Sequence, residues 1–151
     1  AGVQGGEVRI VGACRGPGSF TGIRVGLAAA QGLARGWGIH AVGVDAFEAW
    51  GRWAGDGGPW LVLLPLGRQD WTGALVDGSG KVAWGPSRGE RGRLQEEAPG
   101  QRPVVGPAES GGPKRHGGLA GAVAALAPGR GAEPVPGYGA DPAALGRVGR
   151  V

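Results

Sequence analysis

The stretch from Gly16 to Ala34, GPGSFTGIRVGLAAAQGLA, limits the fold of this chain more than any other part of its sequence. An apolar run ends at Cys14, a glycine-rich turn follows, and the next residues have helical spacing, which predicts a strand, a tight loop and a helix. Glycines in the loop allow positive φ angles, and Ser19 can cap the first N–H groups of the helix. Because helix N-termini attract anions, the loop is a candidate site for the phosphate of a nucleotide. Its candidate residues are Gly16, Gly18, Ser19, Thr21 and Gly22.

Two adjacent apolar faces are expected on this helix at 100° per residue. One carries Ile23, Leu27, Ala30 and Ala34, and the other carries Gly22, Gly26, Ala29 and Leu33. Glycine inside a helix costs about 1 kcal/mol relative to alanine, so close packing against a second helix is expected to offset the cost of the second face. The alternative is that both faces are covered within the same domain. The residues that we expect at an interface with a partner are Gly22, Ile23, Gly26, Ala29, Ala30 and Leu33.

The same stretch resembles the signature of the TsaB (YeaZ) family, a bacterial member of the actin-like and sugar-kinase-like (ASKHA) superfamily. The family motif reads GPGSFTG-[LIV]-R-[IV]-G and is followed by a K/Q-G-L-A-like segment. This sequence matches it from Gly16 to Gly26 and from Gln31 to Ala34. The resemblance implies an α/β protein with a partial actin-like (ribonuclease H-like) fold, in which two small lobes each hold a mixed sheet flanked by helices.

The resemblance also implies a role in making threonylcarbamoyladenosine next to the tRNA anticodon. TsaB-like proteins are non-catalytic partners of the related catalytic subunit TsaD, and a TsaE-like ATPase and ATP complete the assembly. In that family the helix after the motif contributes to the heterodimer interface, in agreement with the small-residue face. We therefore expect a TsaD-like and a TsaE-like partner, indirect contact with tRNA and no cofactor on this chain. A homodimer through the same helix is a further expectation.

The order of elements along the chain predicts two lobes, over residues 1–55 and 59–151, with the GDGGP sequence as their boundary. In the first lobe, two parallel strands flank the central helix, and Asp45 caps a helix that extends through Trp53. In the second lobe the DGSG sequence indicates a hairpin. The predicted strands are Glu7–Cys14, Ile39–Val44, Trp60–Leu66, Trp71–Val76, Lys81–Trp84 and Val104–Gly106, the later helices are Arg88–Glu97 and Gly118–Ala127, and the end from Pro128 is extended.

The family opens with a strand, two further strands and a helix for which the sequence before Glu7 offers no counterpart. In the superfamily those strands pair with the strand predicted here at Val8–Cys14. We therefore expect a truncated form of the family fold. One alternative to the partner role is that the chain is an inert fragment that is unable to dock with its partner.

Composition places few further limits on function. Glycine (36) and proline (12) make up about a third of the 151 residues, but recurrent apolar runs predict a packed core. The net charge of +4 comes from scattered arginines, which do not define a nucleic-acid-binding face. Cys14 is the single cysteine and is expected to be a small buried residue. With no apolar run of about 18 residues, we expect a cytoplasmic protein that does not cross a membrane.

Enzymatic alternatives are weaker than the partner role. The loop at 16–22 lacks the Gly-Lys-Ser/Thr of a Walker motif, but the order of strand, Gly-x-Gly, helix and strand ending at Asp45 leaves open a nucleotide- or dinucleotide-binding enzyme. His40 and His116 are far apart in the sequence and do not form a metal-binding helix motif. Ser19 does not lie in the G-x-S-x-G context of a serine hydrolase. No catalytic residue and no metal ligand is predicted.

Overall fold

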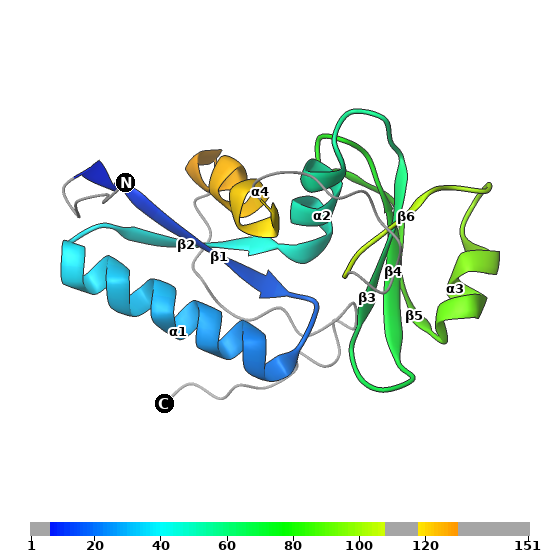
Figure 1. Cartoon of the computed structure of the whole chain (residues 1–151), viewed down its shortest axis with the longest axis horizontal. Coiled ribbons are helices and arrows are strands. Elements are labelled where there is room, and N and C mark those ends of the chain that lie inside the picture. The colour runs from blue at the N-terminus through cyan, green and yellow to red at the C-terminus, as the bar shows by residue number, and fades with distance from the viewer. Residues whose placement is uncertain (1–6, 108–117, 130–151) are drawn as a thin grey trace.

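The computed structural model describes residues 7–107 and 118–129, which form two sheets with helices packed against them (Figure 1). The predicted α/β class is confirmed. The elements in chain order are β1 (Ile10–Gly16), α1 (Phe20–Trp37), β2 (His40–Asp45), α2 (Ala46–Ala54), β3 (Trp60–Pro65), β4 (Trp71–Val76), β5 (Val82–Gly89), α3 (Arg91–Glu97), β6 (Val104–Val105) and α4 (Gly118–Leu126).

The first sheet is a parallel pair, β1 with β2, joined by α1. Side chains alternate between its two faces, so that Val11 and Ala13 pack against α1, whereas Cys14 packs against Val123 of α4. The expectation of a mixed sheet is wrong for this lobe, because its two strands are connected through one helix and run in the same direction. Both faces of the pair are covered by helices, as parallel strands require.

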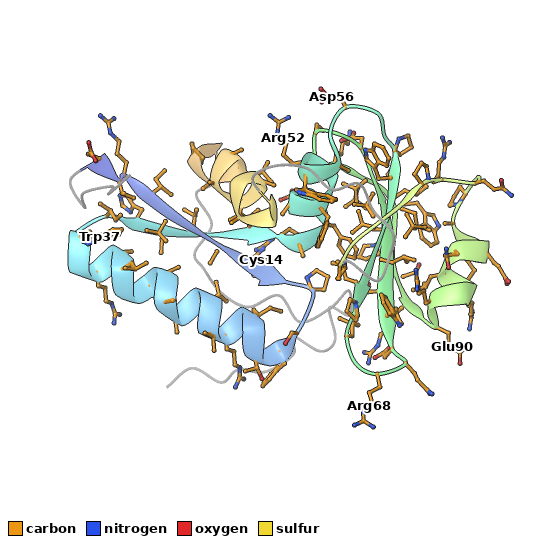
Figure 2. The ribbon with its side chains drawn as sticks, in the orientation of Figure 1. Cys14, Trp37, Arg52, Asp56, Arg68 and Glu90 are labelled. Carbon is orange, nitrogen blue, oxygen red and sulfur yellow. The ribbon has the colours of Figure 1, made fainter. Side chains whose placement is uncertain are left out.

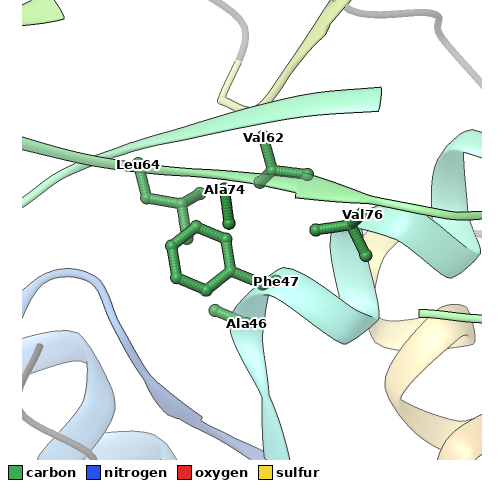
Figure 3. Close-up of a cluster of buried hydrophobic side chains, with 6 residues drawn as sticks. All are labelled: Ala46, Phe47, Val62, Leu64, Ala74 and Val76. Carbon is green, nitrogen blue, oxygen red and sulfur yellow. The ribbon is translucent and has the colours of Figure 1, made fainter. Parts of the chain in front are cut away.

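Helix α2 connects the two sheets through its opposite sides. Phe47 lies 3% exposed against Val62, Leu64 and Val76 of the second sheet (Figure 3). Ala49 lies fully buried on the other side, in a cluster with residues of β2 and α4. The two lobes therefore share one helix between their cores.

The second sheet has the order β5-β4-β3-β6, with β6 parallel to β3 and the other pairs antiparallel. The predicted hairpin at 77–80 is confirmed, since the Asp77 carboxylate accepts hydrogen bonds from the N–H groups of Ser79 and Lys81. Strand β5 continues to Gly89 because Arg88 pairs with Thr72, so the prediction that a helix begins at Arg88 is wrong and α3 begins at Arg91.

Helix α4 returns to the first sheet, although it belongs to the range 59–151 that was expected to form the second lobe. It contacts β1 and α2. A Cβ atom at Gly12 would lie 3.1 Å from the Val123 and Ala127 side chains, so glycine at this position lets α4 approach β1 closely. The end of the chain was predicted to be extended from Pro128, but a short 3₁₀ helix spans Ala127–Gly129. The rest of that predicted segment lies outside the described residues.

Replacing Gly51 with alanine is expected to destabilise the junction between α2 and β4. A Cβ atom there would lie 2.5 Å from Val76 Cγ1 and 2.8 Å from the carbonyl oxygen of Asp77. Such overpacking costs about 1–3 kcal/mol, which urea unfolding would measure. Gly92→Ala in α3 is the matched control, because a Cβ atom at Gly92 meets nothing within 4 Å. Equal unfolding midpoints for the two variants would contradict this packing.

Candidate functional site

Helix α1 is capped at both ends by residues of its own sequence. At its start the Ser19 hydroxyl accepts a hydrogen bond from the Gly22 N–H at 3.3 Å, which confirms the predicted cap. At its end Gly38 adopts the left-handed conformation (φ 66°), and its N–H donates to the carbonyl groups of Ala34 and Arg35. The helix therefore has a fixed position along β1 and β2.

One apolar face of α1 is used inside this chain. Ile23, Leu27 and Ala30 pack with Ala13 and Val11 of β1, and each of the three is less than 10% exposed. Ile23 and Ala30 were among the six residues expected at a partner interface. Their side chains lie in the core of the first lobe, beneath the surface that a partner could touch.

The other four expected interface residues form an exposed strip along α1, which we call the outer flank. They are Gly22, Gly26, Ala29 and Leu33. The side chain of Leu33 is 45% exposed, and a Cβ atom at Gly26 would meet nothing within 4 Å. Trp37, at the end of the helix, is also exposed at 44% (Figure 2). No described residue of the chain covers the outer flank at Gly26.

The predicted phosphate loop leads into a cavity of about 430 Å³ between α1, β1 and α4. Gly18, Ser19 and Gly22 line this cavity, whereas Thr21 is exposed and Gly16 is buried with a φ of 107°. The remaining lining residues are Gly12, Ala13, Cys14, Ile23, Gly26, Ala120 and Val123. None of these lining residues is positively charged. An anion in the cavity would therefore meet backbone N–H groups but no positively charged side chain among the described lining residues.

Asp45 follows β2 and caps α2, as predicted. Its Oδ1 accepts a hydrogen bond from the Phe47 N–H at 2.8 Å. Burial raises the pKa of this carboxyl group above its ordinary value of 3.8, and the Phe47 N–H opposes the rise. Burial likewise raises the pKa of the Cys14 thiol, which lies where the two sheets approach each other (Figure 2). Asp45 therefore has a structural role at the end of β2.

Substitutions at Asp45 should distinguish the effect of its helix cap on stability from the effect of its buried charge. Because the pKa is raised in the folded state, the charged form destabilises the fold, and stability falls as pH rises from about 3.8 through the folded pKa. Asp45→Asn keeps the acceptor and should be free of this pH dependence, whereas Asp45→Ala, which lacks both the charge and the cap, should be about 1 kcal/mol less stable than Asp45→Asn at every pH. Urea unfolding at about pH 3 and pH 7 measures both effects. A pH-independent difference between the parent chain and Asp45→Asn would contradict the burial of the charge.

Two further features limit the chemistry of the described residues. No three His, Cys, Asp or Glu side chains lie together there as metal ligands would; His40 is exposed at the start of β2, and His116 is outside the described range. Within the same ranges, every helix is too short or too polar to cross a membrane.

The contribution of α4 to this site was not predicted. Ala120 and Val123 form one wall of the cavity beside Gly22 and Gly26, about 100 residues earlier in the sequence. The apolar pattern of 118–127 indicated a helix but carried no local signal of which sheet that helix would cover.

Comparisons with known proteins agree with this geometry. Residues 1–70 match the family model of TsaD, tRNA N6-adenosine threonylcarbamoyltransferase. The fold is similar to that of YeaZ from Pseudomonas aeruginosa, with a TM-score of 0.61 and 20% sequence identity over 90% of this chain and 76% of that chain. A second similar structure is described as an uncharacterized protein with similarity to peptidase YeaZ from Pseudomonas aeruginosa. It has a TM-score of 0.60 and 19% sequence identity, again over 90% of this chain and 76% of that chain. A search of curated proteins found no match. The predicted two-lobed α/β fold class is thereby confirmed by the likeness to the YeaZ structures.

Proposed function

We propose that this chain is a partner subunit in tRNA threonylcarbamoyl modification, as its similarity to the TsaB (YeaZ) family suggests. The match to the TsaD family over residues 1–70 and the YeaZ-like fold both support a role in this modification. The observation that carries the partner role is the outer flank of α1, which is exposed along its length and open at Gly26.

The outer flank suits a helix of another protein because its residues are small. Packed helix axes lie about 8–10 Å apart, and the shorter distances require small side chains at the contact. Gly22 and Gly26 are one turn apart, and Ala29 and Leu33 continue the same strip. The four glycines within α1 each carry a helix-propensity cost, and at Gly26 no contact inside the described part of the chain offsets it. A partner helix would offset it.

The partner that we propose is a TsaD-like catalytic subunit, which docks on the outer flank. This chain then acts without catalysing the transfer itself, and a TsaE-like ATPase uses ATP in the same assembly. Contact with tRNA is indirect, through the TsaD-like subunit, and the assembly works in the cytoplasm. When the partner is absent, two copies of this chain pair through the same flank.

Reconstitution tests this function directly. The TsaD-like and TsaE-like proteins of the same organism are combined with ATP, a threonylcarbamoyl donor and tRNA, with and without this chain, and the modified adenosine is measured. We expect modification only when all three proteins are present, and none with this chain alone. Modification by this chain alone would contradict a non-catalytic role, and full modification without it would contradict any role in the assembly.

A nucleotide titration separates this function from its main rival. If the chain is instead a nucleotide-binding enzyme, calorimetry should detect saturable binding of ATP or NAD that is lost in Gly18→Val, because Gly18 lines the cavity at the start of α1. The partner role predicts no saturable binding of either nucleotide to the isolated chain.

A further inference from the structure

Two loops of this chain carry an aspartate directly before a glycine. Asp56–Gly57 lies in the loop between α2 and β3, and Asp77–Gly78 lies in the hairpin between β4 and β5. The other aspartates of the described ranges, Asp45 and Asp70, are each followed by a residue with a side chain. Glycine has no side chain to shield its backbone N atom, so this atom is open to a reaction with the preceding carboxyl group.

The reaction between these two groups needs only water. The glycine N atom bonds to Cγ of the protonated aspartic acid, the C–OH bond breaks, and water leaves with the amide proton, which closes a succinimide ring. Water then opens the ring at either carbonyl carbon. Opening at the main-chain carbonyl gives isoaspartate, in which the backbone runs through Cβ and Cγ. The rearrangement therefore requires a carboxyl group that takes up a proton and turns freely toward the glycine.

Asp56 meets both requirements in the folded chain. Asp56 and Gly57 are exposed, and Figure 2 shows the Asp56 side chain at the tip of its loop, directed away from the sheets. Within the described ranges, neither the Asp56 carboxylate nor the Gly57 N–H has a hydrogen-bond partner. Rotation of this side chain toward Gly57 thus breaks no interaction with another described residue.

Asp77 has the same neighbour but a restrained carboxylate. Its Oδ1 accepts hydrogen bonds from the Ser79 N–H at 2.9 Å, the Ser79 hydroxyl at 2.6 Å and the Lys81 N–H at 3.0 Å. The Ser79 hydroxyl, followed by the Lys81 N–H, holds the pKa of this carboxyl group below its ordinary value of 3.8. Attack by the Gly78 N atom would require these bonds to break and the carboxylate to take up a proton.

We propose that Asp56–Gly57 is a site of spontaneous isoaspartate formation in the folded chain, whereas the hairpin protects Asp77–Gly78. The product adds one methylene group to the backbone next to Gly55, whose carbonyl oxygen accepts the Trp60 indole N–H at 2.9 Å. The modification thus lengthens the main-chain connection between α2 and β3. This inference does not depend on the proposed function, because no residue of the outer flank takes part in it.

Timed incubation of the full chain in mildly acidic buffer, followed by peptide mapping, tests the proposal. Trypsin cleaves after arginine and lysine, so it releases residues 53–68 with Asp56 and residues 69–81 with Asp77 as separate peptides. Water enriched in heavy oxygen labels each ring opening, and fragmentation of the peptides assigns the modified residue. Isoaspartate should form at least about tenfold faster at Asp56 than at Asp77, because hydrogen bonds to the charged carboxylate must first be lost at Asp77.

Two variants and an unfolded sample are the controls. Asp56→Glu keeps the charge but closes the larger ring of glutamate far more slowly, so the modification of residues 53–68 should disappear. Ser79→Ala removes the hydroxyl donor and should speed the reaction at Asp77 while leaving the rate at Asp56 unchanged. In urea, where the loop and the hairpin are both lost, the rates at the two sites should become similar.

Two results would overturn the proposal. One is isoaspartate formation in the folded chain at equal rates at the two sites, or faster at Asp77. The other is a folded chain that forms no isoaspartate at Asp56 while the urea-unfolded chain does, which would mean that the loop between α2 and β3 protects this residue.

Discussion

Gly26→Leu is expected to weaken binding to the TsaD-like subunit by about 10- to 100-fold. A leucine side chain in a close helix–helix contact costs about 1–3 kcal/mol, and each 1.4 kcal/mol is a factor of ten in affinity. In the isolated chain the substitution should be harmless or stabilising, because a Cβ atom at Gly26 meets nothing within 4 Å and leucine favours a helix by about 1 kcal/mol relative to glycine. Calorimetry measures the binding, and urea unfolding shows that the fold is kept.

Gly32→Leu is the matched control for this experiment. Gly32 is also an exposed glycine of α1, and a Cβ atom there would meet nothing within 4 Å, but it lies about 120° around the helix from Gly26. Its substitution should leave the affinity unchanged. Equal losses at both positions, or no loss at Gly26, would show that the outer flank is not the docking surface.

Phe47→Ala is expected to lower the free energy of unfolding by about 3–5 kcal/mol, the usual cost of deleting a buried aromatic ring. Phe47 is 3% exposed between α2 and strands β3 and β4, and α2 also packs on the first sheet (Figure 3). Loss of the ring should therefore destabilise both lobes in one transition. Urea unfolding followed by circular dichroism and by tryptophan fluorescence measures whether the two signals remain coincident.

The second phenylalanine of the chain provides the control. Phe20 is 53% exposed at the start of α1 and stacks under the Arg24 guanidinium, 3.9 Å from the ring centre. Phe20→Ala should cost less than about 1 kcal/mol, the value of an exposed cation–π pair. A similar cost for the two substitutions would contradict the place of Phe47 in a core shared by both lobes.

Local signals in the sequence predicted the elements around α1 and the hairpin. The Ser19 cap, the Asp45 cap and the turn at 77–80 each depend on residues within a few positions of one another. The extension of β5 was missed because Arg88 is held in the strand by pairing with Thr72, and the sequence around Arg88 alone favours a helix. The same reason explains the unexpected place of α4, which is set by contacts with Gly12 of β1.

The site was predicted only in part for a similar physical reason. The helical pattern gave two apolar faces on α1 but not which of them would face β1. The structure buries the face with Ile23 and Leu27, since larger aliphatic side chains gain more from removal from water, and leaves Gly22 and Gly26 outside. The cavity between α1, β1 and α4 could not be predicted from the sequence, because one of its walls comes from α4.

In the proposed complex, the outer flank of α1 receives a helix of the TsaD-like subunit. Amide NMR of the labelled chain during titration with that unlabelled subunit shows which residues of α1 are contacted. Signals of Gly22, Gly26, Ala29 and Leu33 should shift or broaden, and those of Arg24, Gln31 and Arg35 on the polar side of the helix should change little. Binding that leaves the four flank signals in place, or that perturbs only the polar side, would show that the TsaD-like subunit does not dock on the outer flank.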